Sequence, residues 1–443
     1  MKKIITLLLV VLMCASLSAC SDGNSNSAKD TVNITIKVPL ISMECVTDDE
    51  VSSSDQFLQK AWDAFAEQYT DYDVTADVIV FEQTDYQGAI TDCYGTDDAV
   101  DLLYGGYFNI SGYVHDGYAM PLDDIITDEI RSDFDESMWD VSSINGKTYL
   151  MPYLNLQNIL TYNKQMFIDC GLEKYTTDKE EIQGWSLEEW EEIYSTLAAN
   201  LGDNKYIFPM YAKNNQGDTH VMLQLRVKGS EFFDENGRFN LNTPEGIEGL
   251  KWLKDNYDKG YYPANCEDLE INDCGTLFSR GQMAFALFNT ALAQSYDTYP
   301  FERGYVNFPA VNPEGVCSTF VTGFMAFNNG DEKKVEVTKA FLKFIYENEQ
   351  WLDYSAGGIP CSKGTASRHG SEVFMGDMFA ANNKYVVDYQ KNNPNWLGVR
   401  AAFFPHIHAL FTGEETAEEA ALGLDTDCNA AIEEGYANSN ILE

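Results

Sequence analysis

The sequence predicts an α/β protein of two lobes, from strand and helix signals and from its length. Residues 33–38 alternate polar and apolar side chains, and residues 74–80 form a second apolar strand-like run. A capping box at Ser53–Gln56 precedes apolar residues at helical spacing: Leu58, Ala61, Trp62, Phe65 and Tyr69. Strand, helix and strand in this order are typical of an α/β layer. Since 443 residues exceed the usual size of one core, we expect two lobes.

The same order continues along the chain. Residues 101–104 and 159–162 are predicted strands. A second capping box at Ser186–Glu189 and the pair Thr243-Pro244 predict two helix starts, because proline is tolerated at the first helical position. Further helices are expected over residues 335–346 and 416–431.

The N-terminus has the pattern of a secretion signal. Two lysines precede an apolar run over residues 4–17, which is shorter than the roughly 20 residues that a membrane-spanning helix needs. Leu17-Ser18-Ala19-Cys20 then resembles the lipobox of bacterial lipoproteins. The resemblance implies that residues 1–19 are removed and that Cys20 carries lipid. Residues 20–30 would be a flexible tether, so the protein would contact the cell membrane only through its anchor, on the extracytoplasmic face. An ordinary signal peptide with a chance cysteine is the alternative.

The charge balance is strongly acidic. The chain has 29 Lys and Arg against 70 Asp and Glu, a formal net charge of −41. Such a body repels nucleic acid and anionic lipid, so we expect neither as a partner. A neutral or cationic small molecule suits this charge better than a polyanion, although a local cationic pocket could override it.

Signals of catalysis and of metal binding are weak. Apart from Cys14 and Cys20, eight cysteines are scattered without metal-like spacing, and their pairing is open. The sequence has no G-x-S-x-G, H-E-x-x-H or G-x-G-x-x-G motif. His406 and His408 lack a clear third ligand. We therefore expect no catalytic residue, metal or cofactor, while a chance carboxylate pair of a glycosidase stays open.

Landmarks in chain order resemble a known family. They are Asp101–Tyr104, Gly117–Asp123, Asn145–Pro152, Leu160–Lys164, Gly171-Leu172, Trp185–Glu189, Phe278–Phe285, Gly304–Pro309, Ala340–Ile345, Gly357–Pro360 and Leu410–Glu415. Together they are similar to extracellular solute-binding proteins of family 1, the group that contains maltose-binding protein and supplies the capture subunits of ABC importers.

The resemblance implies a fold and its division. The expected fold is the type II periplasmic-binding-protein fold, in which two α/β lobes are joined by a three-crossing hinge around a ligand cleft. By position, the crossings fall near residues 155–160, 304–309 and 348–354. The N-terminal lobe would then comprise residues 31–157 plus 309–350, and the C-terminal lobe residues 158–308 plus 351–443.

The resemblance also implies a function. Such a protein, expected to be a monomer, captures a neutral sugar or oligosaccharide by hinge closure and delivers it to the ABC permease subunits. Sugars are bound by aromatic planes and hydrogen-bonding groups, and 13% of the residues are aromatic. Two alternatives are a cationic or small polar solute as the ligand and a secreted glycan-degrading enzyme.

Position within the resemblance selects the ligand-contacting candidates. Four segments supply them: the end of the third strand, the first crossing, the loop after the helix near residue 280, and a late segment. In this order the candidates are Tyr104, Tyr107, Phe108, Asn109, Tyr153, Asn155, Gln157, Phe288, Asn289, Thr290, Trp396 and Arg400. For each of them, core packing or turn formation is the alternative role.

Overall fold

The computed structural model describes residues 29–39, 47–82, 85–213, 218–234, 236–289, 299–372, 374–387, 390 and 393–441. The predicted lipobox with Cys20, and the candidate Thr290, lie outside these residues. None of the helices within the described ranges is long and apolar enough to cross a membrane.

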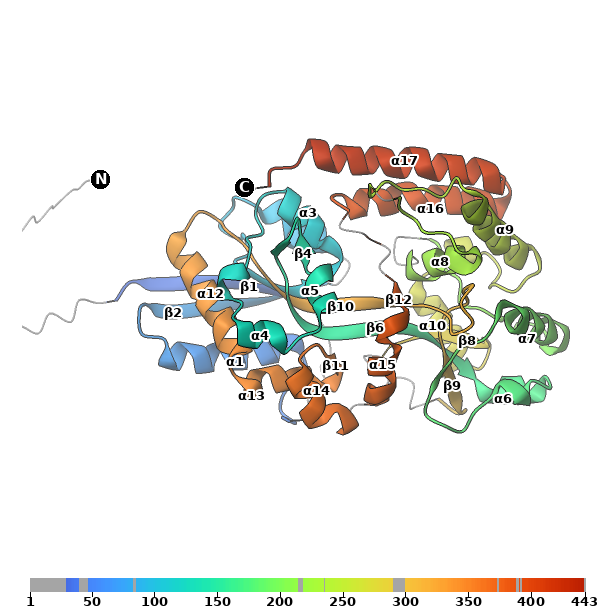
Figure 1. The fold of residues 1–443 in the computed structure, drawn as a ribbon, viewed down its shortest axis with the longest axis horizontal. Coiled ribbons are helices and arrows are strands. Elements are labelled where there is room, and N and C mark those ends of the chain that lie inside the picture. The colour runs from blue at the N-terminus through green and yellow to red at the C-terminus, as the bar shows by residue number, and fades with distance from the viewer. Residues whose placement is uncertain are drawn as a thin grey trace, which may run out of the picture.

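One ten-stranded sheet runs through the molecule, with helices packed around both of its ends (Figure 1). Its main path has the order β2-β1-β3-β10-β6-β9-β7, and β8 and β11 pair with β6 while β12 pairs with β10. The strands are β1 Thr31–Pro39, β2 Asp73–Phe81, β3 Leu102–Gly106, β6 Met151–Asn163, β7 Ile182–Gln183, β8 Phe285–Phe288, β9 Arg303–Val306, β10 Cys317–Ala326, β11 Ile359–Pro360 and β12 Val386–Val387. A separate hairpin pairs β4 Ser143–Ile144 with β5 Lys147–Thr148.

The first lobe is built on the predicted strand–helix–strand unit. Strand β1 pairs in parallel with β2 and with β3, and helix α1 (Ser54–Gln68) connects β1 to β2. Helix α12 (Glu332–Tyr346) joins the same core, where Trp62 of α1 meets Phe341 at 5.0 Å between ring centroids. The other helices of this lobe are α2 Tyr86–Ala89, η2 Tyr107–Asn109, α3 Ile110–His115, α4 Asp128–Ser132, α5 Glu136–Val141, α13 Glu349–Leu352 and α14 Lys363–His369.

Two of the three predicted helix starts form their caps. Ser186 and Glu189 make a complete capping box, and the Thr243 side chain accepts from Gly246 N with Pro244 at the first position. At α1 the helix begins as predicted, but Ser53 makes no side-chain cap. The Gln56 side chain accepts a hydrogen bond from the backbone N–H of Ser52 instead, so the predicted capping box with Ser53 does not form.

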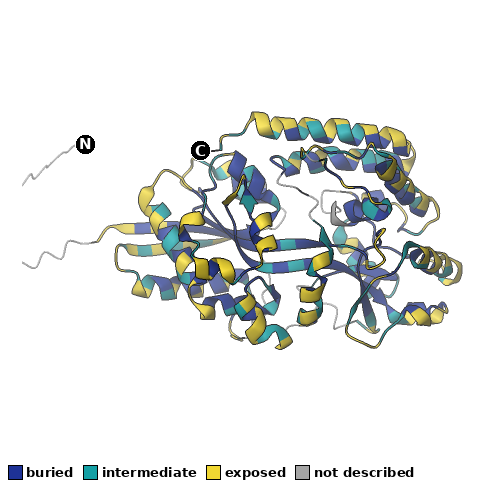
Figure 2. Cartoon of the chain, viewed as in Figure 1, coloured by how far each residue is buried: buried dark blue, intermediate teal, exposed yellow. Residues whose placement is uncertain are grey.

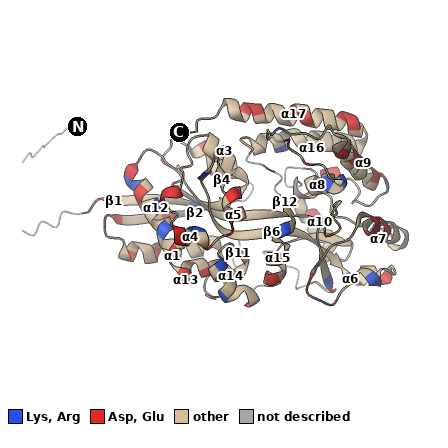
Figure 3. Ribbon diagram, viewed as in Figure 1, with Lys and Arg blue, Asp and Glu red and all other residues tan. Residues whose placement is uncertain are grey.

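The second lobe surrounds the other end of the sheet. Its helices are α6 Lys164–Asp169, α7 Leu187–Asn200, α8 Asp218–Leu225, α9 Pro244–Asp258, α10 Ile271–Ser279, α15 Gly376–Asn382, η11 Asn383–Tyr385, α16 Trp396–Thr412 and α17 Ala417–Ala437. Helices α16 and α17 pack on each other, and α17 also packs on α9. Their inner faces are buried while the outer face of α17 is exposed (Figure 2). Acidic side chains gather on such outward helices, and the long strands are mostly uncharged (Figure 3).

Strands β6 and β10 carry the chain between the lobes. They pair antiparallel, from Met151 with Phe324 in the first lobe to Asn158 with Ser318 toward the second. Tyr153 and Val321 belong to the first hydrophobic core, whereas Leu160 belongs to the core of the second lobe. The predicted first crossing near residues 155–160 therefore coincides with the middle of β6.

The structure places the other two crossings elsewhere than expected. Residues 303–306 form β9, which pairs with β6 beside the second core, and β10 is the strand that runs between the two cores. Trp351, Tyr354 and Cys361 pack in the first core, while Ile359, Met375 and Phe379 join a cluster on the second lobe's side. Residues 351–354 thus lie in the first core, and the chain first meets the second lobe's side at Ile359.

The described cysteines form no disulfide. Cys93, Cys170, Cys266, Cys274, Cys317, Cys361 and Cys428 are free thiols, and all but Cys93 are buried. Burial raises the pKa of the Cys317 thiol well above its usual range, which keeps it protonated and unreactive.

Candidate functional site

The crossing segment of β6 and β10 has two faces with different surroundings. Side chains alternate between the faces of a strand. Tyr153, Asn155 and Gln157 of β6 share one face, and Leu154, Leu156 and Asn158 share the other. Leu154 and Leu156 keep partial exposure, whereas the three side chains of the first face are buried. The two faces therefore have different roles.

The first face is closed by a buried network of amides, which we call the hinge network. It comprises Asn155, Gln157, Asn307, Thr319, Asn382 and Asn383. The Gln157 amide donates to Phe379 O at 2.8 Å and to the Asn383 side chain, and its oxygen accepts from Asn382 Nδ2 at 3.1 Å. Asn382 and Asn307 exchange two further bonds of 2.9 Å. Thr319 donates to Asn155.

This network ties the third crossing to the two crossing strands. Asn382 and Asn383 follow that crossing, and Gln157 lies on β6. The candidates Asn155 and Gln157 therefore lie on the face of β6 that the hinge network covers. Their side-chain amides are hydrogen-bonded to other residues of the protein. Gln157 is fully buried.

Three more candidates lie inside the first lobe. Tyr104 and Tyr153 are in its core, and their rings meet at 5.8 Å. The Tyr153 hydroxyl donates to Trp351 O at 2.6 Å, and burial raises the Tyr104 pKa well above its usual range. Asn109 is buried and donates to the Tyr113 hydroxyl at 3.3 Å. These contacts are those of packing residues.

The opposite face of β6 and β10 adjoins a cavity that both lobes line. Phe320 of β10 contacts two candidates from the first lobe, with ring centroids 6.1 Å from Tyr107 and 5.0 Å from Phe108. From the second lobe, Trp396 lines a cavity together with Tyr107 and Phe108. Ile110, Ser111, Gln390 and Asn393 complete its lining. We call this space the interlobe cavity.

The interlobe cavity is neutral and small. None of its seven lining residues is an acid, a lysine, an arginine or a histidine. Its open volume of about 10 Å³ holds roughly one water molecule. Ligand sites usually measure about 300–1,000 Å³, so the lobes must move apart before a ligand can enter here.

A larger groove continues along the same helix. Trp396, Arg400, Phe404 and His408 succeed one another at four-residue spacing, which places them on one face of α16. The last three line a groove of about 680 Å³, which we call the α16 groove; Ala212, Lys213 and Glu414 are among its other lining residues. His408 Nε2 lies 2.8 Å from Glu267 O, a contact that fixes its ring. The candidates Trp396 and Arg400 thus lie one turn apart along a continuous helix face.

The structure also shows residues that sequence reasoning missed. Asn158 donates to Ser318 Oγ at 3.2 Å and accepts from the candidate Asn289 at 3.1 Å. Asn158, Ser318 and Phe320 share the face of the crossing strands that adjoins the interlobe cavity. The only sequence signal for them is strand alternation, which does not say which face meets the cleft. Phe288 is fully buried in the second lobe against Tyr305.

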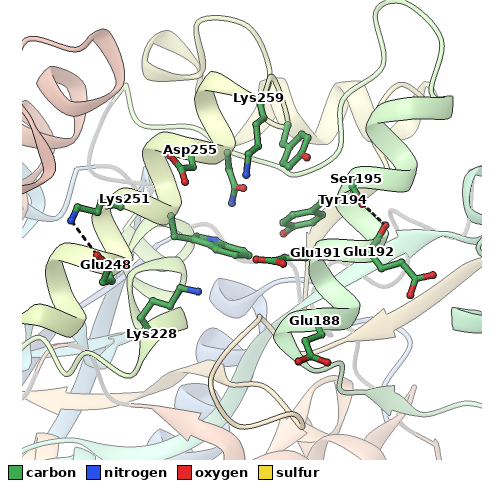
Figure 4. Close-up of a pocket in the computed structure, with 13 residues that line it drawn as sticks. Glu188, Glu191, Glu192, Tyr194, Ser195, Lys228, Glu248, Lys251, Asp255 and Lys259 are labelled. Atoms are coloured by element: carbon green, nitrogen blue, oxygen red, sulfur yellow. Dashed lines mark hydrogen bonds and ion pairs between the residues drawn. The ribbon is translucent and has the colours of Figure 1, made fainter.

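A third hollow lies on the outside of the second lobe (Figure 4). It measures about 540 Å³ between α7 and α9, and Tyr194 and Trp252 lie in it. Carboxylates and lysines are mixed around it, and Lys251 pairs with Glu248 at 3.1 Å. Every lining residue comes from the second lobe, so a ligand there would not bridge the lobes.

Two α/β lobes that share crossing strands around a cleft define the class of two-lobed solute-binding proteins. The sequence matches the family of bacterial extracellular solute-binding proteins over residues 49–350, and the chain belongs to this family. The fold is the type II periplasmic-binding-protein fold, as the sequence landmarks predicted. The family is extracellular by description, so the chain works outside the cytoplasm.

Individual relatives are distant. A putative binding protein of Brucella abortus is 25% identical over 270 residues, which cover 59% of this chain and 62% of that protein. The diacetylchitobiose binding protein DasA of Streptomyces coelicolor is 23% identical over 286 residues, 62% of this chain and 63% of that protein. An ABC substrate-binding protein from Listeria monocytogenes, solved in complex with cycloalternan, has a TM-score of 0.70 at 18% identity and covers 91% of this chain and 99% of that one. All three are binding proteins, and the chain spans about three fifths of the length of the two curated relatives.

Proposed function

We propose that this chain is the lipid-anchored binding subunit of an ABC importer, and that it captures a neutral sugar or oligosaccharide by closing its lobes. It would act as a monomer at the cell membrane, hand the ligand unchanged to separate permease subunits, and catalyse no reaction. The relatives named for diacetylchitobiose and cycloalternan support a carbohydrate ligand.

The observation that carries this proposal is the composition of the interlobe cavity. Tyr107 and Phe108 from the first lobe face Trp396 from the second, with Gln390 and Asn393 as amides beside them. Aromatic planes stack on the apolar faces of sugars, and amides bond their hydroxyls. Because the rings come from both lobes, a sugar between them stabilises the closed state over the open one.

The charges near the cleft argue against a cationic ligand. The interlobe cavity has no carboxylate, and the adjoining α16 groove is lined by Arg400 and Lys213 beside one acid, Glu414. A cation would require carboxylates around an aromatic box, and the described lining residues do not supply them.

A thermal-shift panel tests the proposal. Mono- and oligosaccharides, spermidine and amino acids are each added to the purified protein, and the midpoint of unfolding is measured. A sugar at 100 times its dissociation constant should stabilise the fold by about 2.7 kcal/mol. Stabilisation by spermidine and by no sugar would contradict the proposal, and a sugar recovered chemically altered would contradict a pure binding role.

Two variants locate the site, and a third tests the anchor. Trp396→Ala should weaken binding of the sugar at least tenfold, as truncation of a buried aromatic anchor does. Trp252→Ala, its matched control in the hollow between α7 and α9, should leave the dissociation constant unchanged. Cys20→Ala should move the protein from the membrane fraction to the soluble fraction; unchanged fractionation would contradict lipidation at this cysteine.

A further inference from the structure

The C-terminal end of the chain connects the two lobes a fourth time. Helix α17 belongs to the second lobe, where it packs on α16 and α9. The Asn395 side chain at the start of α16 donates to Ala431 O at 3.0 Å, which fixes α17 to that lobe. Beyond α17, residues 438–441 continue onto the first lobe and reach the end of α3 (Figure 1). We call residues 438–441 the C-terminal strap.

The strap makes specific contacts with the end of α3. Asn440 N donates to His115 O at 2.6 Å, and His115 Nδ1 lies 2.8 Å from Ser439 Oγ. The His115 ring meets the Tyr436 ring edge-on, with centroids 5.5 Å apart. Ile441 packs against the hydrophobic core of the first lobe. Backbone, side-chain and apolar contacts therefore hold the strap in one position.

The surface beneath the strap is shaped to receive it. His115 is buried, with 7% of its surface exposed. Gly117 has a φ of +82°, and a Cβ at this position would lie 2.6 Å from Asn440 O. A side chain at residue 117 would therefore displace the strap as well as strain the backbone. The close approach indicates that this docking is a defined feature of the fold.

The strap lies on the cleft side of the molecule. Ile110 and Ser111 of α3 line the interlobe cavity, and Trp396 at the start of α16 lines it from the other lobe. The hinge network lies on the opposite face of β6 and β10. Opening of the lobes about these strands would consequently separate α3 from α16 and α17.

We propose that the C-terminal strap is a latch that stabilises the closed arrangement of the lobes before any ligand binds. Separation of α3 from α17 pulls residues 438–441 away from His115, so the contacts of the strap are made in full only in the closed state. A contact made in one of two states shifts the equilibrium toward that state by its free energy. The strap thereby sets the fraction of closed protein and, through it, the apparent affinity for a ligand.

The experiment measures the shape of the full chain without any sugar. Small-angle X-ray scattering compares the parent protein with a chain that ends at Ala437 and with the variants Ser439→Ala and Ile441→Asp. Truncation at Ala437 removes two hydrogen bonds, at roughly fivefold each, so it should shift the closed-to-open ratio by about 25-fold and raise the radius of gyration. Ser439→Ala removes one of them and should shift the ratio about fivefold. Leu422→Asp, on the exposed side of α17, is the matched control for Ile441→Asp and should leave the radius unchanged.

The outcomes separate the latch from the rest of the account. If the chain ending at Ala437 does not fold, Ser439→Ala and Ile441→Asp decide by the same measurement, with thermal unfolding to show that they are folded. Folded variants with the parent radius of gyration would overturn the latch. Because no sugar is present, that result would leave the sugar-binding proposal intact, and a failed sugar panel would leave the latch intact.

Discussion

Phe320 offers the sharpest test of which face of the crossing strands meets the ligand. Its ring lies on the cleft side of β10, against Tyr107 and Phe108 at 6.1 and 5.0 Å. Phe320→Ala removes two aromatic pairs, worth about 0.5–1.5 kcal/mol each, together with part of a half-buried ring. We expect the free energy of unfolding to fall by about 2–3 kcal/mol.

The larger effect should be on ligand binding. Phe320 supports the rings of Tyr107 and Phe108, which line the interlobe cavity. Displacement of such aromatic anchors should cost about 1.4–2 kcal/mol of binding, so the dissociation constant of the sugar found in the thermal panel should rise about 10- to 30-fold. Isothermal titration calorimetry measures this constant, and urea unfolding measures the stability. The two readouts distinguish a lost ligand contact from a loosened fold.

The adjacent residue of β10 is the control. Thr319 points to the hinge network, where its hydroxyl donates to Asn155. Thr319→Val keeps the shape and removes one hydrogen bond, so stability should fall by about 1 kcal/mol. Binding should change by no more than about twofold. If Thr319→Val weakened binding as much as Phe320→Ala, or if Phe320→Ala left the constant unchanged, the assignment of the two faces would be refuted.

Three further predictions concern stability. Burial lowers the pKa of His220 to about 3, and no hydrogen-bond partner for its ring is found in the described part of the chain. In the unfolded chain the His220 ring takes up a proton near pH 6.5, whereas in the folded chain it stays neutral. The free energy of unfolding should therefore fall by about 1.4 kcal/mol for each pH unit as the pH is lowered from about 6 to about 4. His220→Leu should flatten that slope in urea unfolding, and an unaltered slope would count against the assignment. Gln157→Ala should lower the free energy of unfolding by about 2–4 kcal/mol, because the partners of its buried amide lose their bonds; a loss below 1 kcal/mol would contradict a closed hinge network. Asp101 is buried and pairs with Lys334 at 2.8 Å, so Lys334→Met should cost about 3 kcal/mol at low and high salt alike, whereas a loss abolished by salt would mark a surface pair.

The sequence predicts what local interactions decide. The β1-α1-β2 unit follows from the alternation over residues 33–38 and 74–80 and from the helical spacing between them. The caps at Ser186 and Thr243 form because their partners are three residues away. At Ser53 a competing neighbour, Ser52, takes the Gln56 side chain, and a pattern search does not separate two adjacent serines.

The cleft is harder to predict because it depends on distant pairing. Alternation divides β6 into two faces, but the face toward the cleft is set by β10, whose Ser318 pairs with Asn158 across 160 residues of sequence. Asn155 and Gln157 are predicted from their position in the first crossing, and position alone does not say which face of the strand they occupy; a shift of one residue exchanges the faces. Tyr107, Phe108 and Trp396 are predicted from their position among the landmarks, and the structure places all three in the lining of one cavity.

Crossings and the strap are invisible to local patterns for a related reason. The third crossing has no proline- or glycine-rich linker, and only the clusters that Tyr354, Ile359 and Met375 join show where it lies. Residues 438–441 have no apolar periodicity, and their role depends on His115, more than 300 residues away. Contacts between residues so far apart in the sequence are set by the folded structure and leave no local pattern.

Closure on a sugar is the central claim, and small-angle X-ray scattering of the full chain with and without the sugar from the thermal panel tests it most directly. Since the strap favours closure of the parent before binding, Ile441→Asp is measured beside it. We predict a smaller radius of gyration of Ile441→Asp on addition of the sugar, abolished by Trp396→Ala in the same chain. A sugar that binds in the calorimeter while the radius of Ile441→Asp stays constant and above that of the parent would contradict lobe closure.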